Sequence, residues 1–249
     1  MLKKIIFFSL ITGSFICSAQ TYQVFKGDTV NRRDKNNLPQ GLWKKYYPPP
    51  SDELFSEGVY KNGKHTGTFR TYYKGGKLQS TLTYRGISEV CDAKLLFEDG
   101  KLKAKGKYND KVKDSLWTYY DDFGTIISTE FYFKGKKESS WKIFYPKGSL
   151  SQETTYKNDV KNGPYKEFFE NGKRKVEGFM KNGNFDGPTI LFHPNGNVWM
   201  KGNYRNGLRD GIWNVFTENG EKDRDDEYKN GINLNAIPEK EEKIEEPKK

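Results

Sequence analysis

The sequence predicts an all-β protein: an elongated antiparallel meander of about eight tandem 24-residue β-hairpin repeats, with no substantial helix in the mature domain. Two observations carry this prediction. A glycine-containing pattern returns at a fixed step, and short aromatic stretches alternate with turn sequences. No segment shows an apolar stripe of helical period and helical length.

The composition agrees with a folded chain that has a thin core. Only 34% of the 249 residues are hydrophobic and the net charge is +10, a balance that leans toward disorder. Aromatic residues, however, make up 15% of the chain, and disordered chains are poor in aromatics. We therefore expect a core built from rings. The same composition disfavours an ordinary enzyme of helices packed on a sheet.

Residues 1–19 have the features of a secretory signal peptide. Lys3 and Lys4 precede the apolar run from Ile5 to Ile16, and small residues follow up to Ala19. The run is shorter than the ~20 residues that a membrane-spanning helix needs. We expect cleavage after Ala19 and an exported protein that is periplasmic, extracellular or associated with the cell envelope.

The two cysteines lead to separate expectations. Lipid attachment at Cys17 is an alternative to simple cleavage, but Ile16 disfavours it because a bacterial lipobox has a small residue at that place. Cleavage leaves Cys91 alone, so no intramolecular disulfide forms. We interpret Cys91 as a small residue at a tightly packed position, with a reactive thiol or an intermolecular bridge as the alternatives.

Two segments flank the repeats. Residues 20–40 are interpreted as an N-terminal cap with the first hairpin, because Gly27 to Pro39 is rich in turn residues. Residues 235–249 are expected to be a charged, disordered tail. From Glu239 onward they are nearly all Glu and Lys, with only Ile244 to bury.

The repeat array occupies residues 41–234. Each repeat begins with Gly-x-Trp-x-x-Tyr-Tyr or a variant of it, a short aromatic stretch that suits a strand. An Asn-Gly or Gly-Gly pair then offers a two-residue centre that accepts positive φ and closes a hairpin. The second glycine of the repeat recurs at positions 76, 100, 124, 148, 172, 196 and 220.

The second strand of each repeat alternates between inward and outward residues. Val198, Met200, Gly202 and Tyr204 face one way, and Trp199 lies on the other side. A similar inward set is expected for Arg174, Val176, Gly178 and Met180. Small residues on this strand leave room for a ring from a neighbouring strand; they are Ser80, Ala104, Gly106, Gly178 and Gly202.

Two features leave the sequence ambiguous or irregular. Trp117 and Tyr120 are three residues apart, so either both faces of the sheet carry rings or a bulge realigns them. The last repeat reads Glu221 to Glu227, almost wholly charged, where the others place Leu or Val. Repeat arrays need polar caps, and we interpret this segment as one.

The pattern Gly-x-Trp-x-x-Tyr/Phe-Tyr/Phe-x-x-Asn/Gly-Gly-Lys-Leu, followed by Tyr-Lys-Asn-Gly, resembles the MORN repeat in its bacterial variant form. The resemblance covers roughly residues 38–231 and departs at Cys91-Asp92-Ala93, at Thr189 and in the charged last repeat. It implies an elongated sheet of hairpins that serves in protein contacts, and in some eukaryotic members in contacts with acidic lipid headgroups.

The bacterial variant is often labelled as the antitoxin half of a toxin–antitoxin pair. That label implies binding and neutralising another protein. A secretory signal fits an envelope protein better than a cytoplasmic antitoxin.

No catalytic, cofactor-binding or metal-binding residues are identified. The two histidines, His65 and His193, stand at different repeat positions, whereas nucleophilic catalysis needs a histidine held beside a nucleophile. His193 stands where other repeats have an aromatic ring, and His65 is expected in a turn. There is no Cys-x-x-Cys pair and no phosphate-binding glycine loop. We expect no enzyme and no cofactor.

These observations lead to one functional hypothesis and one alternative. We expect a non-enzymatic secreted or envelope protein, a monomer without a transmembrane segment, that binds another protein as a scaffold and is antitoxin-like in that sense. The alternative is a binder of glycan or anionic lipid headgroups through exposed rings and lysines. Lysines spread through every turn also blunt sheet edges, and nucleic acid is not an expected partner. The basic residues are densest at Arg32-Arg33 and Lys44-Lys45.

Overall fold

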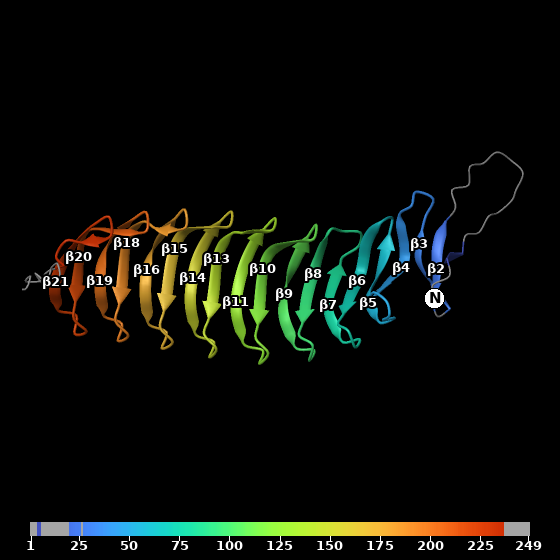
Figure 1. The fold of residues 1–249 in the computed structure, drawn as a ribbon, viewed down its shortest axis with the longest axis horizontal. Helices are drawn as coiled ribbons and strands as arrows, with labels where there is room; N and C mark the ends of the chain where they lie inside the picture. Colours follow the sequence, from blue (N-terminus) through green and yellow to red (C-terminus); the bar gives the residue numbers. More distant parts are fainter. Residues whose placement is uncertain (1–3, 6–19, 26, 237–249) are drawn as a thin grey trace, which may run out of the picture. The chain divides into compact units, whose positions relative to one another are not determined.

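The computed structural model describes residues 4–5, 20–25 and 27–236. The expected signal peptide and the expected charged tail therefore lie largely outside the described residues. The chain divides into two units, residues 1–149 and residues 150–249, and each is described by itself. All the regular elements of the described residues are β-strands, so the prediction of an all-β chain is confirmed (Figure 1).

Both units consist of short strands that follow one another along the chain. The strands of unit 1 are β1 (Lys4–Ile5), β2 (Thr21–Phe25), β3 (Asp28–Arg33), β4 (Pro39–Tyr46), β5 (Leu54–Lys61), β6 (Lys64–Tyr72), β7 (Leu78–Tyr84), β8 (Val90–Leu96), β9 (Leu102–Asn109), β10 (Val112–Tyr120), β11 (Ile126–Phe133), β12 (Lys136–Lys137) and β13 (Ser139–Phe144). The strands of unit 2 are β14 (Leu150–Lys157), β15 (Val160–Phe168), β16 (Arg174–Lys181), β17 (Asn184–Phe185), β18 (Gly187–Phe192), β19 (Val198–Arg205), β20 (Leu208–Phe216), β21 (Lys222–Lys229) and β22 (Ile232–Asn233).

Within each unit, strands pair antiparallel with their neighbours in sequence. In unit 1 the pairings run from β1 to β11, and β12 and β13 both pair with β11. In unit 2 they run from β14 to β16, β17 and β18 both pair with β16, and the series continues to β22. Each unit is therefore a meander of consecutive hairpins, as the sequence predicts.

A tight two-residue turn ends most repeats, and the exception is the longer loop of residues 85–89 between β7 and β8. At Asn206-Gly207 both residues take positive φ, 52° and 85°, which is the type I′ geometry that matches the twist of a hairpin. The Gly207 N–H also donates to the Phe185 carbonyl at 2.8 Å, so each such turn is bonded to the preceding repeat. The prediction of Asn-Gly hairpins is confirmed at these turns.

The turn in the middle of each repeat is different. The expectation of a two-residue centre with positive φ holds at Gly75-Gly76, where φ is 87° and 78°, but it is wrong at the Asn-Gly turns in this position. In the Asn171-Gly172 turn only the glycine takes a positive φ, 80°. The Gly172 N–H donates to the Phe169 carbonyl and the Phe169 N–H to the Lys173 carbonyl, which is a type I turn followed by a left-handed glycine. The reason is local: the Asn171 side chain accepts the Lys173 N–H at 3.0 Å and so favours right-handed backbone at the asparagine.

A β-bulge marks the first glycine of the Gly-x-Trp pattern, which was not anticipated. Gly211 has φ 73° and lies where β20 slips in register against β19. Ser115 takes the same conformation, φ 61°, in β10. Cys91 takes no such conformation, and β7 and β8 pair without a register shift. The bulge thus belongs to the repeats that keep the glycine or a serine.

The core is a row of rings laid over glycines, as predicted for Gly106 and Gly202. A Cβ placed on Gly202 would lie 2.5 Å from the Trp213 ring, and one on Gly106 would lie 2.3 Å from the Trp117 ring. Both tryptophans are completely buried. Only a residue without a side chain lets the ring lie this close.

Two of the small residues do not lie under a tryptophan, although the Phe185 ring comes within 3.2 Å of a Cβ placed on Gly178. Thr189 stands in place of the tryptophan at Gly178, with the Phe185 ring nearby. Ser80 instead shares a 2.7 Å hydrogen bond with the Thr71 hydroxyl.

The alternation of β19 is confirmed, since Met200 is buried and Trp199 is exposed. Arg174 was expected to face inward but is exposed. It pairs with Phe168 just after a bulge, where the alternation restarts. For Trp117 and Tyr120 the first alternative holds, and both faces of the sheet carry rings. The register slips beside Tyr120, whose ring lies 5.8 Å from the Lys105 ammonium, whereas Trp117 packs in the core.

Candidate functional site

The face that carries the buried tryptophans also holds its own cations. The Lys113 ammonium lies 5.2 Å from the centre of the Trp117 ring and 4.9 Å from that of Tyr132. Four repeats later the Arg209 guanidinium lies 4.6 Å from the Trp213 ring and 5.1 Å from the Tyr228 ring. Cation–π attraction satisfies these charges inside the fold. Burial lowers the pKa of Lys113, and the nearby Glu130 opposes that shift.

Lysines in the mid-repeat turns are also used internally. The Lys101 ammonium donates to the Asp122 carbonyl at 2.6 Å, and the Lys173 ammonium donates to the Asn195 carbonyl. In each case the acceptor belongs to the corresponding turn of the next repeat. These two lysines tie neighbouring turns together, so part of the positive charge has a structural purpose.

His65 lies in strand β6 and not in a turn, so the expectation for this residue is wrong. Its Nε2 shares a 2.8 Å hydrogen bond with the Tyr60 hydroxyl, and its ring stacks on Tyr84 at 5.0 Å. Burial lowers the pKa of His65, and the charges of Lys111 and Lys45 act in the same direction. The strand begins directly after a type I′ turn, which places His65 inside the ring face.

His193 makes the same contact that a tyrosine makes at the corresponding position of another repeat. Its Nε2 donates to the Phe216 carbonyl at 3.0 Å, just as the Tyr73 hydroxyl donates to the Leu96 carbonyl at 2.8 Å. The interpretation of His193 as another ring is supported by this shared contact. The bond links one repeat to the next at the mid-repeat turns.

Cys91 is buried in β8, opposite Tyr84 on one side and Tyr108 on the other. Burial raises the pKa of its thiol, which disfavours the reactive thiolate. The interpretation of a small residue at a tightly packed position is confirmed.

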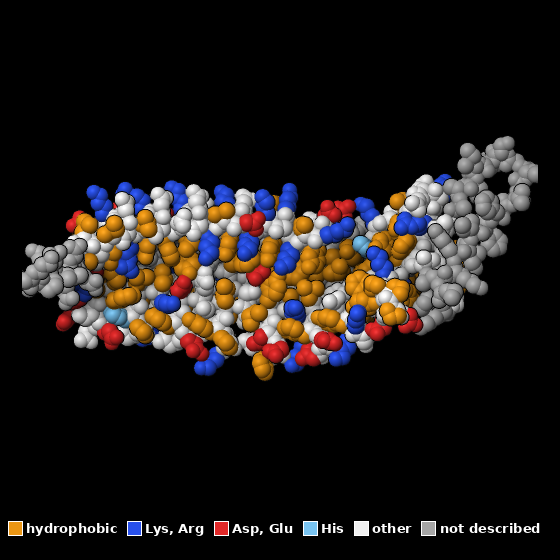
Figure 2. All heavy atoms as spheres, viewed as in Figure 1, with side chains coloured by type: hydrophobic (Ala, Val, Ile, Leu, Met, Phe, Trp, Pro, Cys, Tyr) orange, Lys and Arg blue, Asp and Glu red, His pale blue; other side chains and the backbone are white. Residues whose placement is uncertain are grey.

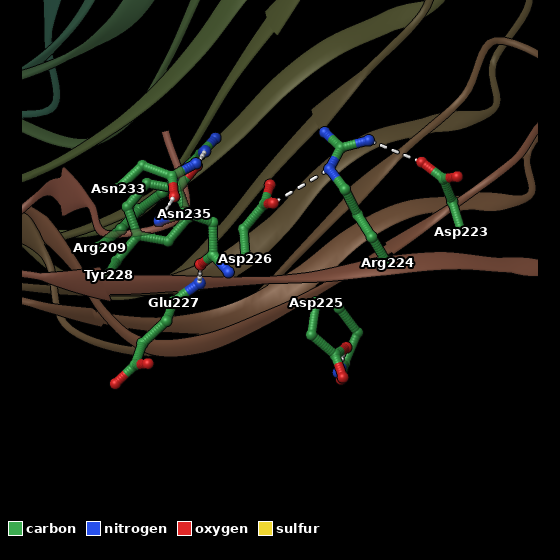
Figure 3. Close-up of polar contacts among 10 residues, drawn as sticks. Arg209, Asp223, Arg224, Asp225, Asp226, Glu227, Tyr228, Asn233 and Asn235 are labelled. Atoms are coloured by element: carbon green, nitrogen blue, oxygen red, sulfur yellow. Dashed lines mark hydrogen bonds and ion pairs between the residues drawn. The ribbon is translucent and has the colours of Figure 1, made fainter. Parts of the chain in front are cut away.

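The last long strand, β21, is a charged edge with internal ion pairs (Figure 3). The buried Asp226 carboxylate accepts from Arg224 Nε at 3.0 Å, and Arg224 Nη1 donates to Asp223 at 2.6 Å. Lys222 pairs with Asp225 at 2.8 Å. Charged side chains on a sheet edge discourage pairing with another strand, which is what a capping repeat requires.

An apolar hollow of about 270 Å³ lies in unit 2, at the turn ends of β16, β18 and β19. We call it the Trp199 hollow, and its lining residues are Phe169, Lys175, Val176, Leu191, Phe192, His193, Pro194 and Trp199. The Trp199 side chain is 44% exposed, and its ring centre lies 6.2 Å from that of His193 at a tilt of 47°. An exposed tryptophan beside an apolar depression is a candidate contact site.

Sequence reasoning placed Trp199 on the outward side of its strand but did not single it out as a site. The signal was present in the repeat itself. One repeat earlier the same position is Lys175, and four repeats earlier it is Lys103. Other repeats place Gln79, Ser151 or Asp223 there, so a tryptophan marks a local departure from a mostly polar outward position.

Other apolar side chains also face outward. In unit 1 Leu116 is exposed and pairs across the strands with Phe131, and Phe133 is exposed nearby in sequence. In unit 2 the exposed Phe179 pairs with Pro164. Figure 2 shows hydrophobic side chains gathered on the face it views, with Lys and Arg spaced among them and along one margin.

Two further features are absent from the described residues. No group of three or more His, Cys, Asp and Glu side chains in this part of the chain is arranged to hold a metal ion. Within the same residues no helix is long and apolar enough to cross a membrane.

Comparison with known families gives the identity of the repeats. The family model described as the MORN repeat variant matches residues 66–85, 137–158, 161–182 and 185–206, and the last three segments start 24 residues apart. No curated protein matches the chain. Each of the last two matched segments covers one hairpin, from a strand before the mid-repeat turn to the tight turn that ends the repeat. The chain is therefore a repeat protein that contains repeats of the MORN variant type.

Proposed function

We propose that this protein is a non-enzymatic, exported binding module that contacts another protein through the outward side of its sheet, centred on the Trp199 hollow. The observation that carries the proposal is the exposed Trp199 beside an apolar depression of about 270 Å³. Protein interfaces concentrate their binding energy in a few aromatic anchors seated in such pockets.

The chemistry of the hollow favours a protein over a glycan. A sugar presents many hydroxyl groups, and its recognition needs amide, hydroxyl or carboxylate partners that fix their orientation. Lys175 and His193 are the only polar side chains in the lining, and His193 already donates to a backbone carbonyl. The tilt of 47° between the His193 and Trp199 rings also leaves no parallel platform for a sugar ring. An apolar side chain of a partner protein suits this lining.

The placement of the cations argues against a general anionic-lipid surface. Lys113 and Arg209 are held over rings, and Lys101 and Lys173 donate to turn carbonyls. Binding to an acidic membrane needs several cations that reach the headgroups together. These four are held by contacts within the fold.

A comparative capture experiment tests the proposal. Wild type, Trp199→Lys and Phe123→Lys are each incubated with a cell-envelope extract, and bound material is identified by mass spectrometry. Trp199→Lys introduces the residue that Lys103 and Lys175 provide at the same repeat position, so the fold should tolerate it. Phe123, which is 87% exposed in a turn of unit 1, is the matched control.

We expect a protein that wild type and Phe123→Lys capture and that Trp199→Lys does not. Capture of the same proteins by all three variants would refute the role of the hollow. Reproducible binding of polysaccharide or lipid alone would favour the alternative function instead.

Export and an antitoxin-like role are further parts of the proposal with their own tests. The mass of the protein recovered from the envelope should correspond to a chain that begins at Gln20, because Ala19 ends the expected signal peptide. For the antitoxin-like role, the captured partner should arrest growth when expressed alone and become harmless when this protein is co-expressed. A partner that is harmless alone would exclude that role but leave protein binding intact.

A further inference from the structure

A second hollow, of about 370 Å³, lies in unit 1 between the first hairpin and β4. We call it the Arg33 hollow, and its lining residues are Thr21, Tyr22, Gln23, Asn31, Arg33, Asn37 and Trp43. Its lining is mostly polar, whereas the lining of the Trp199 hollow is mostly apolar. It combines one guanidinium, three side-chain amides, two hydroxyls and an indole, with no carboxylate. We propose that the Arg33 hollow binds a carboxylate-bearing saccharide.

The guanidinium of Arg33 is held in place with donors to spare. It lies 5.0 Å from the centre of the Trp43 ring, and Nη1 donates to the Asn37 carbonyl at 2.7 Å. Among the side chains that the structure describes, no carboxylate forms an ion pair with Arg33. A guanidinium carries five N–H donors in a planar fork, so the remaining donors match a carboxylate.

The neutral groups around Arg33 are also positioned by the fold. Asn31, with φ 57°, donates to Gln23 Oε1 at 2.6 Å and accepts the Lys44 N–H at 2.8 Å, which ties the hairpin to β4. Gln23 uses only its oxygen in this contact, which leaves its amide N–H groups as donors at the wall of the hollow. Amides and hydroxyls that both donate and accept are suited to sugar hydroxyl groups.

A single guanidinium favours a carboxylate over a phosphate. A carboxylate carries one negative charge, which Arg33 balances, whereas a phosphate monoester carries nearly two at neutral pH. The neighbouring basic residues Arg32, Lys44 and Lys45 are not part of the lining. They raise the local positive potential and so attract an anionic polymer, while the specific contact belongs to Arg33.

Calorimetric titration of the purified protein tests the proposal. The probe is tri-galacturonate, and its methyl ester is the matched neutral ligand with the same hydroxyl groups. We expect the acid to bind and the ester not to bind. Arg33→Lys keeps the charge but removes the planar fork, and should weaken binding by about 10- to 100-fold. Arg70→Lys, an exposed arginine outside the hollow, should leave the affinity unchanged.

A second variant keeps the test sharp if Arg33→Lys perturbs the hairpin. Gln23→Glu preserves the oxygen that accepts from Asn31 but places a negative charge in the hollow, so it should also weaken binding of the acid, by at least about 10-fold. The proposal is overturned if the ester binds as well as the acid, or if both variants bind like wild type. It is equally overturned if the acid does not bind, or if tri-glutamate or glucose 6-phosphate binds more tightly than the acid.

Discussion

The glycine–tryptophan contact of the core makes a quantitative prediction for Gly202→Ala. The new Cβ would lie 2.5 Å from two atoms of the Trp213 ring, whereas ordinary van der Waals contact begins near 3.4 Å. The ring must therefore retreat by about 1 Å. It is completely buried, with Tyr204 edge-on at 5.1 Å and Arg209 over it at 4.6 Å. Overpacking in a rigid surrounding of this kind should destabilise unit 2 by about 2–3 kcal/mol.

Gly178→Ala is the matched control, because Gly178 stands one repeat earlier in the same unit. Its nearest neighbour is the Thr189 hydroxyl at 2.8 Å, and a small side chain yields more easily than an indole. We expect a loss below about 1 kcal/mol there, since part of the strain is offset by the lower chain entropy of alanine in the unfolded state.

A double-mutant cycle isolates the contact. Trp213→Ala alone should cost about 3–5 kcal/mol through the cavity it leaves. In that background Gly202→Ala should become neutral or stabilising by up to about 1 kcal/mol, because the ring is gone and alanine suits a strand better than glycine. Urea unfolding followed by far-ultraviolet circular dichroism measures all four proteins. The reasoning is refuted if Gly202→Ala costs the same with and without Trp213, or no more than Gly178→Ala.

Three further predictions concern the backbone, the thiol and a phenol. Ser115→Gly should stabilise unit 1 by about 1 kcal/mol in the same unfolding assay, because the φ of 61° at this bulge suits glycine better than serine; a loss of stability would contradict this. Cys91 should react with a thiol reagent far more slowly in the native protein than in urea, and equal rates would show that it is accessible. Burial and the Glu57 hydrogen bond raise the pKa of Tyr72 to about 12, above its unfolded value near 10. The stability that this phenol contributes is therefore complete below pH 10 and lost as the pH rises toward 12. Tyr72→Phe should flatten the fall of the unfolding midpoint over that range, and an unchanged pH profile would contradict this reasoning.

The prediction of the fold from the sequence succeeded where the controlling forces act over a few residues. Asn206-Gly207 predicts its own turn, because both residues tolerate positive φ at little steric cost. The alternation around Met200 predicts which side of β19 is buried, since successive residues of a strand point to opposite faces. The pairing of Gly106 with Trp117 follows from the fixed step of the repeat.

The prediction of the fold failed where an additional hydrogen bond or a shifted strand register decided the backbone conformation or the direction of a side chain. The Asn171 side chain changes the type of its turn by accepting a backbone N–H. Arg174 is exposed because the alternation restarts after a bulge. The bulge at Ser115 cannot be read from serine itself, which is an ordinary strand residue in most settings. These effects depend on the partner strand, and the partner is not written in the local sequence.

For the candidate sites, the sequence and the tertiary structure decide different things. Composition and period alone establish a repetitive β-sheet with a core of rings, because hairpin signals and strand alternation are local and are repeated at every step. Which cations remain for binding is decided only in three dimensions. Lys113 is held over rings and Lys173 by a turn carbonyl. Arg33 also lies over a ring and donates to a carbonyl, but its guanidinium has five N–H donors and no carboxylate partner among the described side chains. Basic residues that look equivalent in the sequence therefore differ in the fold. Contacts across strands use the hydrogen-bond donors of some of them, whereas others keep donors that face a hollow.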